Sequence, residues 1–297
     1  MIRFEGLNAL EFYAEFSEPI KCKEYLAQIK WAEGYKCVKC GHNAAQVRKD
    51  YSRTCNKCSH IESASANTLF HKVKFGLHKA FIICFEMSTT TKSLSAKYMA
   101  ERVGVTEYTA RMFMHKVRES MKSSKSQPMV EQVEVDEFVV GGTEEGKVGR
   151  SYDSKKKKAI TALELTPEGK VKRMYIKQIV NFSAKELLPM FEDHISKEAD
   201  ITTDLWRGYR PIAKDYNIEQ IPSDSGKNFQ ILHTMIHKVK TWIRTTYSYV
   251  SAFHINRYFD EFCFRLNRSQ TRNSIFHNLV KRMVQAPKIN HTILVCS

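Results

Sequence analysis

The sequence contains no long run of apolar residues. Its longest such stretch, around Phe81 to Phe85, is far shorter than the ~20 residues that a membrane-spanning helix requires. The first residues, Met-Ile-Arg-Phe-Glu, lack the charged start and the apolar stretch of a secretion signal. These absences argue against a membrane protein and predict a soluble protein of the cytoplasm.

Acidic residues are few in relation to basic ones. Among 297 residues, 47 are Lys or Arg and 32 are Asp or Glu, which gives a formal charge of +15. This excess favours an anionic polymer as the partner, with nucleic acid ahead of a membrane surface. Nucleic acid is therefore the expected class of partner. The length indicates about two domains.

Eight cysteines without a secretion signal indicate reduced thiols or metal ligands rather than disulfides. Four of them form two Cys-x-x-Cys pairs, Cys37/Cys40 and Cys55/Cys58, separated by fourteen residues. This spacing suits a β-hairpin that closes a tetrahedral Zn²⁺ site. Four thiolates leave no coordination position open, so we expect a zinc ribbon with a structural ion.

Residues 93–118 show the pattern of two helices joined by a turn. The first helix ends at Gly104, and Thr106 can cap the second. Any αα-hairpin can contain such a glycine, but the basic composition favours a DNA-binding helix-turn-helix. The side chains that the second helix would offer to DNA are Glu107, Tyr108, Arg111, His115 and Arg118.

A polar linker at residues 121–129 is followed by a β-branched segment, Val133 to Gly142, with Glu-x-Asp-Glu at its centre. Alternate residues of a strand share a face, so Glu134 and Asp136 point the same way. A carboxylate on an apolar strand is costly to bury unless a cation meets it. A bound metal ion is the simplest explanation.

The elements of an α/β layer follow this strand. They are expected at residues 159–165 (strand), 171–180 (strand), 184–195 (helix, with Ser183 and Glu186 as a capping box) and 201–204 (strand). A right-handed crossover would place the last strand parallel to the first. Asp136 would then lie beside Asp204, and the two carboxylates would share the Mg²⁺ or Mn²⁺ ions that phosphodiester displacement uses.

Taken in order, these motifs resemble the zinc-ribbon insertion-sequence transposases of the ISXO type, which have an RNase H-like DDE core. The matching segments are the ribbon from Trp31 to Cys58, the helix-turn-helix, Val135 to Gly142, Gly146-Lys147-x-Gly149-Arg150, Thr203-Asp204-x-Trp206-x-Gly208-Tyr209 and Tyr258 to Arg268. The resemblance implies metal-dependent cleavage of element ends, transfer of the freed strand to target DNA, and at least a dimer. It also implies double-stranded DNA as the partner and association with the nucleoid when DNA is bound.

The expected organisation combines an α/β RNase H-like core with a mixed sheet and a small zinc ribbon and a helical region before it. Its parts are an N-terminal helical segment (1–30), the zinc ribbon (31–66), the helix-turn-helix region (67–126), the DDE core (129–270) and a C-terminal helix and tail (271–297).

The third metal-binding group is where the sequence departs from the family. Members commonly carry Glu or Asn at the position that matches Lys238, and a protonated lysine cannot bind Mg²⁺. His237 and Glu261 are alternative ligands, although Glu261 is equally well explained by an ion pair with Arg265 four residues on. Lys240 matches a lysine of the family and could hold the scissile phosphate.

A second hypothesis follows from this departure. The chain could be a catalytically impaired or domesticated transposase-derived protein that binds DNA through the ribbon and the helix-turn-helix. Such a protein would have no use for Asp136 and Asp204, so substitution of Asp204 by alanine would leave its function intact.

Overall fold

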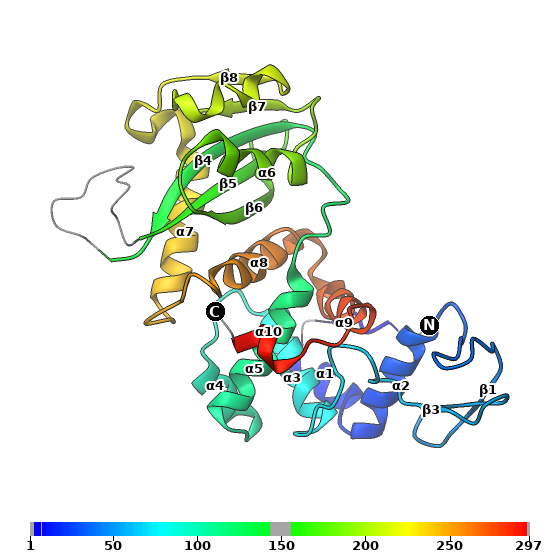
Figure 1. Ribbon diagram of the computed structural model, residues 1–297. Helices are drawn as coiled ribbons and strands as arrows, with labels where there is room; N and C mark the ends of the chain where they lie inside the picture. Colours follow the sequence, from blue (N-terminus) through cyan, green and yellow to red (C-terminus); the bar gives the residue numbers. More distant parts are fainter. Residues whose placement is uncertain (1–2, 7, 143–155, 296–297) are drawn as a thin grey trace. The chain divides into compact units, whose positions relative to one another are not determined.

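The computed structural model describes residues 3–6, 8–142 and 156–295 (Figure 1). The chain forms two compact units, of which unit 1 comprises Met1–Met121 and Arg268–Ser297, and unit 2 comprises Lys122–Asn267. The predicted loop motif from Gly146 to Arg150 lies outside the described residues. No helix in the described ranges is long and apolar enough to cross a membrane.

Unit 1 combines a small three-stranded sheet with a helical core. Its elements are α1 (Ala9–Glu15), α2 (Pro19–Lys30), β1 (Ala45–Val47), β2 (Arg53–Cys55), β3 (Ile61–Glu62), α3 (Leu77–Thr89), α4 (Ala96–Val103), α5 (Glu107–Met121), α9 (Ile275–Gln285) and α10 (His291–Val295). Strands β1, β2 and β3 pair antiparallel in that order.

Helix α9 supplies part of the core of unit 1 although it follows unit 2 in the chain. It packs against α2, α3 and α5. Phe276 of α9 is fully buried, and its ring centroid lies 5.3 Å from that of Phe12 and 5.7 Å from that of Phe81. The segment expected as a C-terminal helix and tail is therefore built into the same core as the N-terminal helices.

Helices α4 and α5 are joined as the sequence predicts. Gly104 ends α4 in the left-handed conformation at φ 62°, which glycine adopts without the clash that a Cβ would cause. The hydroxyl of Thr106 then accepts a hydrogen bond from the backbone N–H of Thr109 at 3.2 Å and caps the first turn of α5. The two helices pack against each other.

Unit 2 is a five-stranded mixed sheet with helices on both faces. Its elements are β4 (Gln132–Val140), β5 (Lys157–Leu165), β6 (Val171–Ile179), α6 (Ala184–His194), β7 (Asp200–Thr203), β8 (Ile218–Gln220), α7 (Gln230–Arg244) and α8 (Ile255–Leu266). The strand order is β6-β5-β4-β7-β8. Strands β4, β5 and β6 pair antiparallel, whereas β7 is parallel to both β4 and β8.

The alternation of side chains along β4 divides the core of unit 2 into two layers. Val133 and Val135 pack in the cluster that α6 covers. Phe138 and Val140 pack on the other face, in the cluster formed with α7 and α8 (Figure 1). Strand β4 therefore lies between α6 on one face of the sheet and α7 and α8 on the other. This placement fixes the face toward which each carboxylate of β4 points.

The start of β4 is anchored by a buried ion pair. Glu164 of β5 is fully buried and accepts hydrogen bonds from Nε of Arg173 and from the backbone N–H of Val130. Arg173 also donates to the carbonyls of Gln127 at 2.9 Å and Pro128 at 2.7 Å. The linker that leads into β4 is thus tied to the sheet.

The predicted strands and the parallel pairing of the first with the fourth are confirmed. Strand β8 was not predicted, since its three residues carry no clear alternation. The predicted capping box of α6 is wrong, because the Ser183 side chain makes no cap hydrogen bond. Its partner Glu186 accepts instead from the backbone N–H of Val180 at 3.0 Å, and so ties the helix start to the end of β6.

Candidate active site in unit 2

Two carboxylates lie where the parallel strands β4 and β7 separate. Val135 pairs with Thr203 in the parallel ladder, so Asp136 and Asp204 are the next residues on neighbouring strands. Burial raises the pKa of the Asp136 carboxyl, and the negative charge of Asp204 contributes to the same shift. Asp136 lies within β4 and Asp204 directly follows the last residue of β7, and two repelling carboxylates at the point where the parallel pairing ends favour a bound cation.

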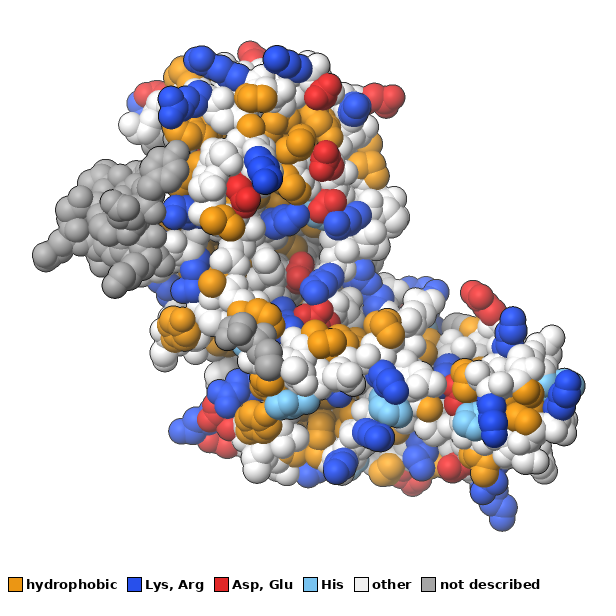
Figure 2. Space-filling model, in the orientation of Figure 1, with side chains coloured by type: hydrophobic (Ala, Val, Ile, Leu, Met, Phe, Trp, Pro, Cys, Tyr) orange, Lys and Arg blue, Asp and Glu red, His pale blue; other side chains and the backbone are white. Residues whose placement is uncertain are grey.

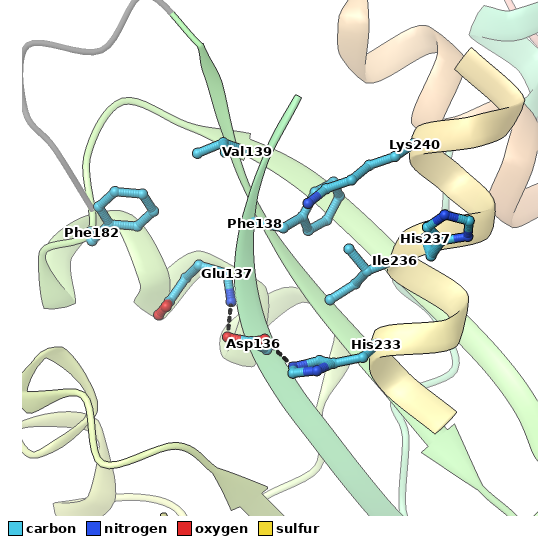
Figure 3. Close-up of a pocket in the computed structure, with 9 residues that line it drawn as sticks. All are labelled: Asp136, Glu137, Phe138, Val139, Phe182, His233, Ile236, His237 and Lys240. Atoms are coloured by element: carbon cyan, nitrogen blue, oxygen red, sulfur yellow. Dashed lines mark hydrogen bonds and ion pairs between the residues drawn. The ribbon is translucent and has the colours of Figure 1, made fainter. Parts of the chain in front are cut away.

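Asp136 is held by two hydrogen bonds. Its Oδ1 accepts from the backbone N–H of Glu137 at 2.7 Å, and Nε2 of His233 donates to its Oδ2 at 3.1 Å (Figure 3). His233 comes from the first turn of α7, and its positive form opposes the rise in the pKa of Asp136. The orientation of this carboxylate is therefore set by its own strand and by α7.

Asp204 begins a turn that strand β8 fixes. Its Oδ1 accepts from the backbone N–H of Trp206 at 3.0 Å. From β8, Nε2 of Gln220 donates to the carbonyls of Asp204 and Trp206, both at 3.0 Å. The indole of Trp206 donates to the carbonyl of Phe182 at 2.9 Å, and a Cβ on Gly208 would lie 2.5 Å from the indole nitrogen. This close approach explains the glycine.

A pocket of about 480 Å³ opens beside Asp136. The described residues that line it are Asp136, Glu137, Phe138, Val139, Phe182, His233, Ile236, His237 and Lys240 (Figure 3). Asp204 is not among these lining residues. It follows the last residue of β7, the strand that pairs with the one carrying Asp136. The pocket combines apolar walls with an acidic and a basic side, as sites for small polar groups commonly do.

Lys240 provides the basic side of this pocket. Its side chain extends from α7 toward β4, and Nζ lies 5.6 Å from the centroid of the Phe138 ring (Figure 3). Burial lowers the pKa of Lys240 and the charge of Arg244 lowers it further, whereas the charge of Asp136 raises it. A half-buried ammonium near a carboxylate is suited to an anionic group such as a phosphate.

One face of α7 borders the pocket. His233, His237 and Lys240 follow one another at four and three residues, which places them on the same side of a helix. Lys238, the position that matches the third metal-binding group of the ISXO type, is exposed and does not line the pocket. Sequence reasoning did not single out His233, although this spacing could have indicated it.

Glu261 lies elsewhere. It is fully buried on α8, where it accepts a hydrogen bond from Nη2 of Arg265 at 2.6 Å, and it does not line the pocket. The ion pair with Arg265 that the sequence offered as the alternative explanation is present.

The four cysteines form a preassembled metal site in unit 1. The sulfur atoms of Cys37 and Cys58 lie 3.6 Å apart, as do those of Cys40 and Cys55. A tetrahedral ion with Zn–S bonds of about 2.3 Å requires sulfurs about 3.8 Å apart, so the donor set fits Zn²⁺. Across the described residues, no other group of three or more His, Cys, Asp or Glu side chains brings its ligand atoms within 4.8 Å of one another.

Each cysteine pair sits in a turn that aims backbone donors at sulfur. Burial raises the pKa of Cys37, but the N–H groups of Lys39 and Cys40 point at its sulfur and help to lower that pKa to about 6. The residue after each pair is left-handed, Gly41 at φ 74° and Ser59 at φ 57°. Thiolates stabilised by N–H groups are the form that binds a metal ion.

The five residues predicted to face DNA from α5 differ in accessibility. Glu107, Tyr108 and Arg111 are exposed, whereas His115 and Arg118 are each only 2 % exposed. Arg111 pairs with Glu107 at 3.7 Å, and the Tyr108 hydroxyl is hydrogen-bonded to His291 of α10, a residue of the same unit. The accessible part of the predicted DNA surface is therefore the first two turns of α5.

Comparison with known protein families identifies one match. Residues 128–267, nearly the whole of unit 2, match the family described as the ISXO2-like transposase domain. The match confirms the resemblance to ISXO-type DDE transposases that the motifs indicated. Neither a curated protein nor a solved structure matches the chain significantly.

Proposed function

Because the chain carries an ISXO2-like transposase domain at residues 128–267, we propose that it is the transposase of an insertion sequence. It binds the terminal repeats of the element, cleaves the DNA at the element ends with the help of divalent metal ions, and transfers the freed 3′ ends to target DNA. The observation that carries the proposal is the parallel pairing of β4 with β7, which brings Asp136 next to Asp204. We assign unit 2 to the RNase H-like class on the same topology.

In this proposal Asp136 and Asp204 hold the Mg²⁺ or Mn²⁺ ions, because hard carboxylate oxygens suit these cations and the two charges repel without them. The ions would activate the attacking oxygen and stabilise the leaving one. Lys240 binds the scissile phosphate from the opposite wall of the pocket. Phe138 and Phe182 supply apolar walls that limit the access of water.

His233 is our candidate for the third group, in place of Lys238 or Glu261. Its Nε2 lies 3.1 Å from Asp136. Two ligands of one octahedral ion at about 2.1 Å lie about 3 Å apart, so an ion could replace the hydrogen bond between these atoms if Nε2 gives up its proton and Nδ1 carries one. His237 remains the second candidate because it also lines the pocket. An imidazole ligand favours Mn²⁺ over Mg²⁺, and activity should be higher with Mn²⁺.

Recognition of the element ends is assigned to unit 1. We propose that α4 and α5 act as a helix-turn-helix with Glu107, Tyr108 and Arg111 toward the bases, and that a structural Zn²⁺ stabilises the ribbon. The net charge of +15 supports an extended DNA contact. Lys and Arg side chains are spread over the face shown in Figure 2, where acidic side chains are fewer. Two element ends require at least a dimer.

The second candidate function is DNA binding without catalysis. The lysine at position 238 favours this function, because a protonated lysine cannot bind a metal ion. The spacing of the other candidate ligands favours it too: among the described residues, Asp136, Asp204 and His233 do not bring three ligand atoms within 4.8 Å of one another. A transposase-derived regulator would keep unit 1 and tolerate the loss of these side chains.

The test is cleavage of DNA that carries the repeats flanking the protein's own gene, with Mg²⁺ or Mn²⁺. Asp136→Asn is the catalytic control, and Asp224→Asn, an exposed carboxylate away from the pocket, is the matched control. Metal-dependent cuts that are lost only in Asp136→Asn support the transposase. Specific binding without cuts in any of the three proteins would establish the second function. His233→Ala and His237→Ala then separate the two candidates for the third group.

A further inference from the structure

Two exposed aromatic rings lie in the segment that joins α7 to α8. Tyr249 is 78 % exposed and Phe253 is 40 % exposed. Each carries a cation near its ring: Nζ of Lys157 is 5.0 Å from the Tyr249 centroid, and the Arg257 guanidinium carbon is 5.2 Å from the Phe253 centroid. An exposed ring accompanied by a cation is a combination that nucleic-acid-binding proteins use to stack bases.

The segment that joins α7 to α8 is anchored by residues of the hydrophobic core. Val250, next to Tyr249, is 8 % exposed and belongs to the core cluster of α7 and α8. Tyr247 packs against Trp242 at 5.8 Å and against Tyr258 at 4.6 Å between ring centroids. Because its neighbours are anchored, the Tyr249 ring is presented to solvent by a fixed backbone, which lowers the entropy lost when a ligand stacks on it.

This surface lies at the start of β5, the strand that pairs with the strand carrying Asp136. The charges of Arg244 and Lys156 both act on Lys240, and Lys157, which follows Lys156, reaches the Tyr249 ring. Lys157 pairs with Val140, four residues beyond Asp136 along β4. At the rise of a strand this is about 14 Å, or roughly four stacked base steps of DNA.

We propose that Tyr249 is the stacking platform for an unpaired base of the DNA strand whose phosphate enters the Asp136 pocket. The proposal rests on the function proposed above, and it adds that the DNA is locally unpaired a few nucleotides from the reacting phosphate. The cations Lys156, Lys157 and Arg244 bind the intervening phosphates. Phe253 supports the next base or sugar.

The test uses zinc-loaded protein without added Mg²⁺ or Mn²⁺ and short oligonucleotides, so it does not depend on cleavage. A duplex carrying a single unpaired 2-aminopurine is compared with the fully paired duplex of the same sequence. We expect quenching of the 2-aminopurine fluorescence on binding. Tyr249→Ala should remove the quenching and weaken binding to the unpaired duplex about 5- to 150-fold, with little change for the paired duplex.

Three further variants make the result specific. Tyr249→Phe and Tyr249→Trp keep the ring and should retain the quenching, whereas Tyr249→Leu keeps an apolar side chain without a π face and should lose it. Equal affinities and equal quenching for Tyr249→Ala and the wild type would overturn the proposal. A change in oligomer mass with unchanged DNA binding would overturn it too, because the ring would then contact a second copy.

The two proposals fail in different ways. If the wild-type protein quenches the fluorescence but never cuts DNA, the stacking role of Tyr249 stands and the proposed transposase function is wrong. If the protein cuts DNA but substitution of Tyr249 does not change binding to the unpaired duplex, the transposase function stands and the stacking role is wrong.

Discussion

Gln220 offers a test of how the position of Asp204 is maintained. Its amide donates two hydrogen bonds at 3.0 Å, to the carbonyls of Asp204 and Trp206. Gln220→Met keeps the shape of the side chain and removes both donors. At about 1 kcal/mol for each hydrogen bond, the loss is about 2 kcal/mol. This corresponds to a fall of about 4–8 °C in the melting temperature of a domain of this size.

The effect on metal binding should be similar in free energy to the effect on folding, because each tenfold change corresponds to about 1.4 kcal/mol. Groups that orient metal ligands change metal affinity or activity about 10- to 100-fold when they are removed. We therefore expect Gln220→Met to raise the Mn²⁺ concentration for half-maximal cleavage by this factor, with maximal rates largely recovered at high Mn²⁺. Glu219→Gln, an exposed neighbour on β8, is the matched control and should behave as the wild type. An unchanged Mn²⁺ requirement in folded Gln220→Met would refute the role assigned to the turn.

Three further predictions concern the zinc site, the buried ion pair and the carboxylate of β4. Cys55→Ser removes one of four thiolates, so bound zinc measured with a chromogenic chelator should fall well below one ion per chain, and thermal unfolding of unit 1 should shift down. Glu164→Gln leaves the charge of Arg173 without its partner and should cost about 3–5 kcal/mol in urea unfolding at pH 7. Burial raises the pKa of Glu164, but the hydrogen bond and charge of Arg173 lower it overall. The ion pair therefore stabilises the fold above the usual glutamate pKa, and this stabilisation is lost as the pH falls through the lower pKa of Glu164 in the folded state. The difference in unfolding free energy between Glu164→Gln and the wild type should therefore shrink in acid. The pKa of Asp136 is raised by burial and by Asp204. Its contribution to stability is favourable below the usual aspartate pKa and is lost as the pH rises through the folded value. Zinc-loaded Asp136→Asn without added Mg²⁺ or Mn²⁺ should therefore melt a few degrees above the wild type at pH 7, and equal or lower melting would contradict this assignment.

Local chemistry made several features predictable from the sequence. The two Cys-x-x-Cys pairs predicted a four-sulfur site, because the ligand spacing alone defines such turns. The neighbouring positions of Asp136 and Asp204 were predictable because a crossover of the usual hand leaves β7 parallel to β4. The register pairs Val135 with Thr203, and the two carboxylates are the next residues of their chains. Gly104 and Thr106 marked the turn before α5 for equally local reasons.

Features that depend on packing between distant segments were not predictable in the same way. The burial of His115 and Arg118 follows from the elements packed on α5, including α9, which lies more than 150 residues further along the chain. The contact between His233 and Asp136 depends on which side of α7 faces the sheet, and that is set by the core residues of the helix. Gln220 was overlooked because β8 is too short to show a pattern.

The return of the chain through α9 also fixes the order in which a ribosome can complete the two units. Unit 2 is continuous in sequence, and its last residue, Asn267, is synthesised before any residue of α9. Unit 1 must wait for Phe276 and its neighbours, so the ribbon and the α4–α5 pair remain without part of their core throughout the synthesis of unit 2. A chain that ends between Asn267 and α9 would thus contain all of unit 2 but only part of the core of unit 1, so a nonsense mutation there would destabilise unit 1 and leave the sheet of unit 2 intact.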